Sequence, residues 1–153
     1  MPEYKQAKII SSGIQSIYDL VIDIESYPDF LPWCAHTRIL EKSNDKIISE
    51  MVVSFSGITE KYTTKVTTQP VKKGCAKVEI NMISGPFKFL NSSWELHNKS
   101  HNTTLVEFQI NFAFKSMLLE KLIGKVFSKA CNKILHAFEE RILTISNKKI
   151  AKK

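Results

Sequence analysis

The sequence predicts an α+β fold in which a run of antiparallel strands is followed by one long helix. Segments of strand-like composition, separated by turn residues, occupy the middle of the chain. In the last of them, Thr104–Lys115, apolar and polar side chains alternate, as in an antiparallel sheet with one face on a core. From Leu119 to Ile145 the apolar residues recur at helical spacing instead. This order favours a helix laid across one face of the sheet.

The N-terminal residues predict a strand and two helices. Tyr4–Ile10 alternates in polarity and is interpreted as the first strand. Ser12 and Gln15 have the spacing of a capping box, and the apolar residues that follow recur at helical period. Ser26 then precedes a Tyr-Pro-Asp sequence, which predicts a second, very short helix that ends at Pro32.

Further strands are expected after this region, which gives a sheet of about six to seven strands. Turn-forming residues, such as those in "QPVKKG", separate them. The segment "TEKYTTKVTT" alternates weakly and is rich in Thr, so its inward face is expected to be less apolar. The predicted strands are Thr37–Lys42, Lys46–Phe55, Thr59–Thr68, Ala76–Met82, Phe87–Leu96 and Thr104–Lys115.

The C-terminal apolar stripe predicts one continuous amphipathic helix of about 40 Å, at roughly 1.5 Å per residue. Lysines recur on its opposite side. The sheet must curl around so long a helix, and the space between them is a candidate cavity. Because no repeat or composition shift marks a boundary, residues 1–146 are interpreted as one domain. Residues 147–153, "NKKIAKK", are interpreted as a basic disordered tail.

Composition and charge exclude several classes of protein. No apolar run is long enough to span a bilayer, and the first residues lack the apolar core of a signal peptide. Cys34, Cys75 and Cys131 are widely spaced and form no C-x-x-C, which argues against a disulfide framework or a zinc site and favours a reducing cytoplasm. The formal net charge of +7 fits attraction to anionic membranes or RNA, or a merely solubilising surface.

Candidate catalytic residues are few. None of the common nucleotide-binding, hydrolase or metalloprotease motifs is present. His97 and His101 fall in a predicted loop or strand end, which indicates surface histidines rather than a metal site. Cys34 and His36 are expected to share one face of a strand, either as a reactive thiol or as a buried Cys beside an unrelated His. The sequence therefore predicts no catalytic residue and no metal.

The segment "YPDFLPWCAH", Tyr27–His36, combines two prolines with Tyr, Phe and Trp side chains. Proline fixes φ and removes a backbone donor, so the segment is expected to form a rigid corner. Its rings are interpreted as a gate that meets a lipid, or as a cap on the end of the core. A second segment, "SGPFKFLNSSW", Ser84–Trp94, carries bulky apolar residues on both faces of a strand, which indicates either a partner surface or a buried strand.

These two segments and "AFEER", Ala137–Arg141, occur in the order typical of the coenzyme Q-binding and ribosome-association-toxin family, which this chain resembles from Tyr4 to about Ile145. That family belongs to the START-like, or polyketide-cyclase-like, superfamily. The resemblance implies a helix-grip fold, in which a curved antiparallel sheet wraps around a long C-terminal helix. It also implies non-catalytic binding of coenzyme Q, a polyisoprenoid quinone, in an apolar tunnel, in support of respiration and ubiquinone biosynthesis.

The resemblance places the ligand at a tunnel mouth with two edges, a lid and a facing lip. The face pattern of the last strand and helix adds the interior lining, and Lys88 or the Tyr27 hydroxyl is expected to bond a quinone carbonyl. The lid is Tyr27, Pro28, Phe30, Leu31, Pro32 and Trp33; the lip is Gly85, Pro86 and Phe87; and the lining is Phe112, Phe114, Leu122, Val126, Phe127 and Ala130.

Two other functions stay open. The resemblance implies that some bacterial relatives bind the large ribosomal subunit, and the basic charge fits contact with RNA. More distant relatives are aromatases or cyclases, which need an acid or a base inside the cavity, and the predicted inward faces contain none. We expect no cofactor besides the bound quinone, no DNA partner, a bacterial cytoplasmic location and peripheral contact with the inner membrane.

Overall fold

The computed structural model describes the backbone of residues 3–55 and 57–151 and the side chains of residues up to Ile145. It contains one seven-stranded antiparallel sheet in the order β1-β7-β6-β5-β4-β3-β2. Strands that follow one another in the chain are neighbours in this sheet, except that β1 pairs with β7. The strands are β1 (Glu3–Ile10), β2 (Cys34–Lys42), β3 (Lys46–Phe55), β4 (Ile58–Lys72), β5 (Cys75–Ser84), β6 (Phe87–Ser100) and β7 (Thr103–Phe114).

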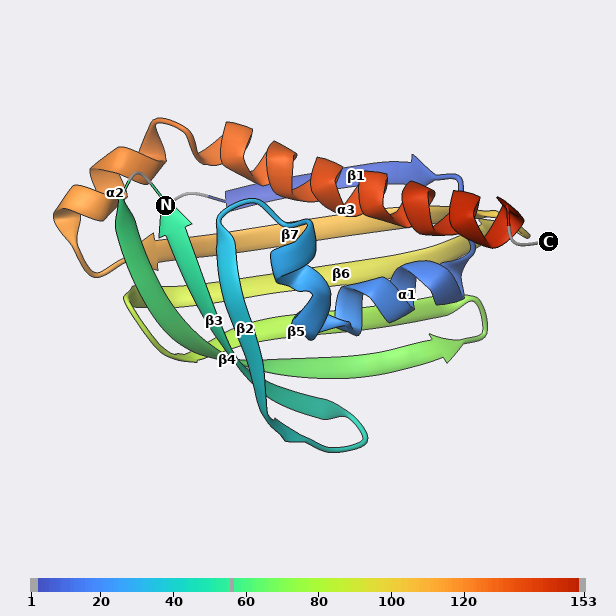
Figure 1. Ribbon diagram of the computed structural model, residues 1–153, viewed down its shortest axis with the longest axis horizontal. Coiled ribbons are helices and arrows are strands. Elements are labelled where there is room, and N and C mark those ends of the chain that lie inside the picture. The colour runs from blue at the N-terminus through green and yellow to red at the C-terminus, as the bar shows by residue number, and fades with distance from the viewer. Residues whose placement is uncertain (1–2, 56, 152–153) are drawn as a thin grey trace.

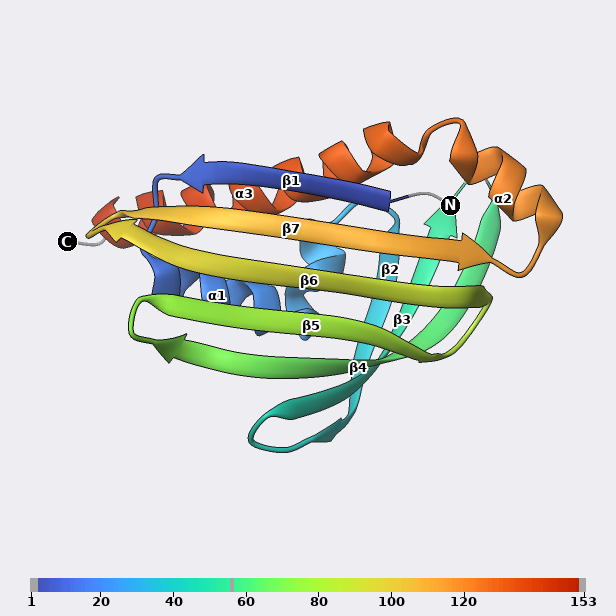
Figure 2. The same cartoon turned by 180° about the vertical axis from the view of Figure 1, so that it is seen from behind.

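Helices cover one face of the curved sheet and leave the other face open. The helices are α1 (Ile14–Ile22), the 3₁₀ helix η1 (Ile24–Asp29), α2 (Met117–Gly124) and α3 (Phe127–Ala151). In Figure 1, α3 runs along the sheet in front of β1 and β7, with α1 and η1 beside it. Figure 2 shows the uncovered face, on which no helix lies over β5, β6 or β7. Among the described residues, no helix has the length and apolar character needed to cross a membrane.

The apolar sides of the sheet and the helices meet in one core. Ile17 from α1, Leu96 from β6 and Leu135 from α3 are almost completely buried there. Each comes from the apolar side of an amphipathic element, and their burial removes apolar surface from water. The predicted α+β architecture, with a curved antiparallel sheet against a C-terminal helix, is confirmed.

The prediction of one continuous helix from Leu119 to Ile145 is wrong, because α2 ends at Gly124 and α3 begins at Phe127. Glycine has a low helix propensity, and it occupies the end of α2. The amide of Val126 donates to the carbonyl of Ile123 at 3.0 Å, which forms a turn in place of a continuing helix. Figure 1 shows α2 turned away from the axis of α3. At its other end the backbone of α3 stays helical to Ala151, within the segment predicted as a tail, and residues 152–153 lie outside the described residues.

The first helix also begins differently from the prediction. Gly13, and not Ser12, is the N-cap of α1, so the predicted capping box does not form. The backbone of Ser12 is held in the turn that leaves β1, where its carbonyl accepts a 2.8 Å hydrogen bond from the Thr104 hydroxyl. The Gln15 side chain bonds Asp19 at 2.8 Å instead of reaching back to the cap. The second helix, η1, has Asp23 and not Ser26 as its N-cap, and it ends at Asp29 and not at Pro32.

A β-bulge explains why β6 carries apolar residues at both odd and even positions. The register of β6 against β7 shifts between Phe87 and Phe89. An extra residue in one strand turns the following side chains to the opposite face. Phe87 and Leu90 are therefore both buried, and Phe87 packs on Phe112 from the neighbouring strand. The buried-strand interpretation of this segment is the one that the structure supports.

Candidate functional site

A cavity of about 120 Å³ lies between the sheet and the helices. Its wall is built from the inward positions of β3 to β7, from the Tyr27 corner and from α3. Most of the side chains are apolar, and Ser, Thr and Tyr supply the polar atoms. The lining residues are Ile24, Tyr27, Leu31, Ser49, Met51, Tyr62, Thr64, Val66, Ile80, Leu90, Ser92, Trp94, Phe108, Ile110, Ile134 and Phe138.

The hydroxyl groups in this wall already have hydrogen-bond partners. The hydroxyls of Ser49 and Thr64 bond one another at 3.0 Å across β3 and β4. Ser92 donates to the carbonyl of Gln109 at 3.0 Å, and Tyr62 donates to the sulfur of Met51 at 3.0 Å. Burial raises the pKa of Tyr62, so its phenol is neutral at physiological pH.

The lining contains no ionisable group suited to acid–base catalysis near neutral pH. Among the described residues, none of the side chains that line the cavity is Asp, Glu, His, Lys or Arg. General acid–base catalysis needs a group whose pKa lies near the working pH, and a buried tyrosine does not meet this condition. The arrangement is suited to holding an apolar molecule.

The predicted lid divides between the cavity wall and the surface. Tyr27 and Leu31 line the cavity, whereas Phe30 packs edge-on against Phe138, with 5.2 Å between ring centres. Pro28 and Pro32 are half-buried beside them. The Tyr27 hydroxyl donates to the backbone carbonyl of Val21, and burial raises the pKa of this phenol. Its hydrogen is therefore not available to a quinone carbonyl in this arrangement.

Trp33 holds the corner in an unusual backbone conformation. Its φ is 65°, in the left-handed region that non-glycine residues rarely occupy. The conformation is fixed by its carbonyl, which accepts a 2.8 Å hydrogen bond from the amide of Ser54, and by its ring, which packs edge-on against Phe55 at 5.4 Å. Such strain persists only where the surroundings enforce it, and it occurs preferentially at functional sites.

The predicted lip lies against β4 and not on the cavity wall. A Cβ atom at Gly85 would lie 2.5 Å from the Cβ of Tyr62, so only glycine allows this approach. Pro86 is half-buried, and its carbonyl accepts from the amide of Lys115 at 2.9 Å. Phe87 packs between Tyr62 at 5.3 Å and Phe114 at 4.7 Å.

A second, smaller hollow of about 60 Å³ lies beneath α2. Phe114 lines this hollow and Tyr62 lines the central cavity, so the Phe87 ring packs between the two. Leu122, predicted to line the interior, is 38% exposed and borders this hollow. The residues around it are Val53, Phe55, Ile58, Glu60, Phe114, Leu119, Leu122 and Ile123.

The other predicted lining residues lie near the cavity but not on its wall. Phe112 and Phe127 are buried and pack together at 5.0 Å, Ala130 is buried beside them, and Val126 is half-buried. The helical stripe is buried at Phe127 and Ala130, but the cavity lies one turn or more further along α3, at Ile134 and Phe138. Lys88 is exposed.

The prediction that Cys34 and His36 share one face is wrong. The register of β2 shifts between them, so Cys34 is buried and His36 is exposed. Burial raises the pKa of the Cys34 thiol to about 11, which keeps it protonated. The structure therefore favours the buried cysteine over the reactive thiol.

Sequence reasoning missed most of the cavity wall on β3, β4 and β5. The Thr-rich pattern of β4 gave the one available signal, because it predicts a less apolar inward face, and Thr64 occupies that face. Trp94, which belongs to the segment with apolar residues on both faces, is buried at the cavity wall. Nothing in the sequence distinguishes the inward side chains that border a void from those that pack solidly.

Comparison with known proteins agrees with this architecture. The family model described as polyketide cyclase / dehydrase and lipid transport matches residues 11–139. The ribosome association toxin RatA of Rickettsia prowazekii is 41% identical over 141 residues, which cover 92% of this chain and 96% of that protein. The mitochondrial coenzyme Q-binding protein COQ10 homolog B of Xenopus laevis is 26% identical over 91% of this chain and 57% of its own length.

Solved structures show the same fold at low sequence identity. The Zhui aromatase/cyclase from a Streptomyces species superposes with a TM-score of 0.80 at 12% identity, over 92% of this chain and 93% of that one. A START superfamily protein from Mycobacterium smegmatis gives a TM-score of 0.74 at 17% identity, over 94% of this chain and 98% of that one. The helix-grip prediction is confirmed, and the chain belongs to the polyketide cyclase / dehydrase and lipid transport family.

Proposed function

We propose that this protein is a non-catalytic carrier that binds coenzyme Q or a similar isoprenoid quinone between the sheet and α3. The observation that carries the proposal is the apolar cavity, with its ring of aromatic and aliphatic side chains. Transfer of an isoprenoid chain into such a space gains about 25 cal/mol per Å² of apolar surface removed from water. Similarity to a protein named as coenzyme Q-binding supports the choice of ligand.

The hydroxyl pair on β3 and β4 supplies a donor for a quinone carbonyl. Ser49 and Thr64 carry one hydroxyl hydrogen each, and the bond between them uses one of the two. The second hydrogen is free to point into the cavity, where a carbonyl oxygen accepts it. This pair takes the place of Lys88 and Tyr27, because Lys88 is exposed and the Tyr27 hydroxyl donates to Val21.

The ligand requires more room than the closed cavity offers. A cavity of about 120 Å³ is well below the roughly 300–1,000 Å³ typical of ligand sites, so binding must open the structure. Phe87 packs between this cavity and the 60 Å³ hollow beneath α2. Rotation of its ring would join the two spaces and give the isoprenoid tail a path toward α2.

The surface of α2 fits exchange of this cargo with an anionic membrane. Met117 and Leu118 are 77% and 67% exposed at the start of the helix. Lys115, Lys121 and Lys125 are exposed around them. Apolar side chains flanked by lysines are typical of helices that lie at a membrane interface. This surface is next to the hollow through which the tail would leave.

Catalysis as an aromatase or cyclase is not supported by the cavity. The similarity to the Zhui aromatase/cyclase is one of fold alone, at 12% identity. The lining offers Ser, Thr and Tyr hydroxyl groups, and burial raises the pKa of the Tyr62 phenol. These groups can orient a bound ligand through hydrogen bonds but are poorly suited to move a proton at neutral pH.

A second candidate function is association with the ribosome. It is favoured by the 41% identity to a ribosome association toxin that spans nearly the full length of both chains. The lysines at 121, 129 and 133 are exposed on α2 and α3, Lys125 is exposed in the turn between the helices, and together they give a basic surface. Clustered cations bind phosphate backbones with little further specificity, and such binding weakens steeply with salt.

The deciding experiment is native mass spectrometry and solvent extraction of the protein purified from a quinone-producing bacterium. We expect close to one quinone per chain, and less in an Ile110→Trp variant, whose larger side chain enters the cavity. An Ile9→Trp variant, at an exposed position on β1, is the matched control and should retain the ligand. A chain without quinone that co-sediments with ribosomal subunits in a salt-sensitive manner would reject the carrier function and support the second candidate.

A further inference from the structure

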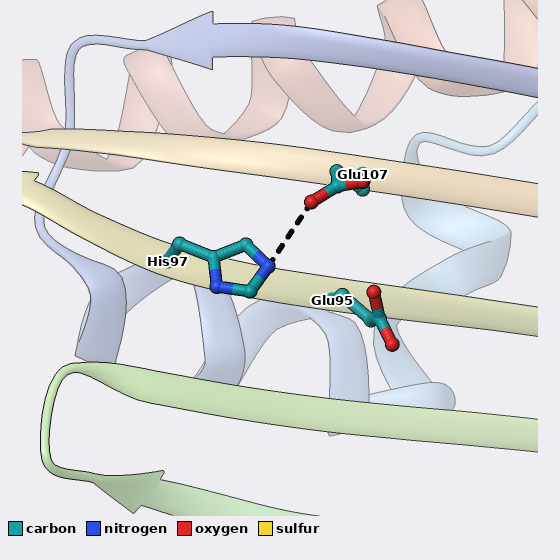
Figure 3. Close-up of side chains that lie close together, drawn as sticks. All are labelled: Glu95, His97 and Glu107. Carbon is teal, nitrogen blue, oxygen red and sulfur yellow. Dashed lines mark ion pairs between the residues drawn. The ribbon is translucent and has the colours of Figure 1, made fainter.

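The open face of the sheet carries a cluster of metal-ligating side chains, remote from the cavity. Glu95 and His97 are two residues apart on β6, and Glu107 lies on β7. Strand alternation places the first two on one face, and the register pairs Glu95 directly with Glu107. One ligand atom from each of the three lies within 4.8 Å of the others, and Figure 3 shows the side chains together above the strands.

We propose that this cluster binds a divalent transition metal ion of the Zn²⁺ type. The geometry requires little adjustment. Ligand atoms at about 2.1 Å around a tetrahedral ion are separated by roughly 3.4 Å. The ligand atoms are at present up to 4.8 Å apart, so each separation has to shorten by little more than about 1 Å. Rotation of partly exposed side chains allows this movement.

The charges in the cluster favour a cation. Two carboxylates directly opposite one another on neighbouring strands repel. Glu107 bonds the Nε2 atom of His97 at 3.1 Å, and Glu95 is only 3.5 Å from Lys77. Lys77 has its shorter ion pair, 2.8 Å, with Glu79, so it keeps a partner when Glu95 turns toward a metal.

Cys75 supports His97 from the side away from the carboxylates. It lies opposite His97 in the register of β5 and β6, and its sulfur is 3.6 Å from Nδ1. When Nε2 binds the metal, Nδ1 carries the proton and can donate it to this sulfur. Histidine ligands are commonly oriented in this way by a partner of the second ring nitrogen.

The donor set selects the type of metal. One imidazole nitrogen and two carboxylate oxygens are typical ligands of Zn²⁺ and its neighbours in the transition series. Mg²⁺ and Ca²⁺ prefer six or more oxygens, which the cluster does not supply. Water completes the coordination, because the face is open to solvent.

The test is a calorimetric titration of the metal-stripped, untagged protein with Zn²⁺. We expect one ion per chain, with binding at least about ten-fold weaker in His97→Gln and in Glu107→Gln. His101→Gln and Glu41→Gln remove the same groups at exposed positions outside the cluster and should bind like the parent. Binding of Zn²⁺ should also raise the melting temperature of the parent but not of His97→Gln, because the ion links β6 to β7.

Three outcomes would overturn the assignment. The first is that the parent binds no Zn²⁺. The second is that both cluster variants bind Zn²⁺ as tightly as the parent, and the third is that an equal concentration of Mg²⁺ displaces the bound Zn²⁺. A Cys75→Ser variant separates a supporting thiol from a ligating one. We expect Cys75→Ser to keep one ion per chain with weaker binding. If the site is lost in Cys75→Ser but kept in His97→Gln, the cysteine and not the cluster holds the metal.

Discussion

The guanidinium carbon of Arg141 lies 5.6 Å from the centre of the Phe30 ring, so a cation from α3 covers the aromatic corner. Phe30 and Tyr27 both pack edge-on against Phe138, one turn earlier on the same helix, at 5.2 and 5.3 Å. The Nε atom of Arg141 is buried and has no hydrogen-bond partner among the described residues. The contact with the Phe30 ring is therefore the interaction through which the guanidinium meets the corner.

Replacement of this cation should loosen the corner. In Arg141→Gln the stem remains but the charge is lost, and a cation–π contact contributes about 0.5–1 kcal/mol at a partly exposed site. We expect the free energy of unfolding in urea to fall by that amount and bound quinone to exchange faster. Arg141→Lys keeps the charge but lacks the planar group. Its unfolding free energy and its rate of quinone exchange should therefore lie between those of the parent and of Arg141→Gln. Parent-like exchange in Arg141→Gln would show that the contact does not hold the corner.

Gly85 should tolerate no side chain. An added Cβ would meet the Cβ of Tyr62 at 2.5 Å, and the φ of 151° is itself unfavourable for other residues. We expect Gly85→Ala to lower the unfolding free energy by about 2–3 kcal/mol, measured by chemical denaturation. Gly57, with a φ of 80° and no atom within 4 Å of an added Cβ, is the control for backbone strain alone. Equal losses in both alanine variants would remove the steric explanation.

Phe87 should control passage between the central cavity and the α2 hollow. In Phe87→Leu the stacking with Phe114 and the edge-on contact with Tyr62 are lost, but most of the buried volume remains. We expect faster release of bound quinone, followed by transfer to acceptor vesicles, and a loss of stability of about 1–2 kcal/mol. Phe89→Leu, on the other side of the bulge, provides the comparison. Release that is unchanged in Phe87→Leu, or equally fast in both variants, contradicts the assignment.

Buried thiols should limit stability at alkaline pH. Burial raises the pKa of Cys34 to about 11 and that of Cys131 to about 12. A thiol whose pKa is higher in the folded state stabilises the fold fully below its unfolded pKa, near 9, and this contribution is lost as the pH rises through the folded pKa. We expect the melting temperature of the parent to fall above pH 9. Measured from each protein's own value at pH 7, the fall should be smaller in Cys131→Ala, which lacks one of the two buried thiols.

Alkylation gives an independent check on the same cysteines. At pH 8 in the folded protein, iodoacetamide should modify exposed Cys75 and leave Cys34 and Cys131 intact, with all three reacting in urea. Mass spectrometry of the peptides distinguishes the three sites. Rapid modification of Cys34 without denaturant would show that the corner opens far enough to expose the strand beneath it.

The strands were predictable because one face of each meets the core and the other meets water. In β7, Val106, Phe108 and Phe112 are buried while Glu107 is exposed, as its alternation predicts. The helix break at Gly124 was not predictable in the same way, because the apolar spacing continues on both sides of it. Register shifts were also hidden, since the bulge at Phe87 changes a face without changing the composition.

The site was predictable only as a region. The proline-pinned corner contributes Tyr27 and Leu31 to the cavity wall. The cavity wall on α3 is formed by Ile134 and Phe138 and not by the residues predicted there, because the distance between a helix and a curved sheet depends on packing between distant segments. The metal-ligating cluster escapes the sequence for a related reason. His101 is the neighbour of His97 along the chain, but the partners that His97 meets in space include Glu107 from another strand.

The two edge strands of the open sheet bear on how this protein behaves at high concentration. An unpaired strand edge is a template for strand addition by another copy, and aggregation follows when such an edge is flat and uncharged. Here β2 is interrupted by two register shifts and carries Arg38, Glu41 and Lys42 on its exposed side. The other edge, β1, exposes Lys5. Both edges therefore carry charges that disfavour strand addition, and these charges protect the open sheet from polymerising through its own backbone.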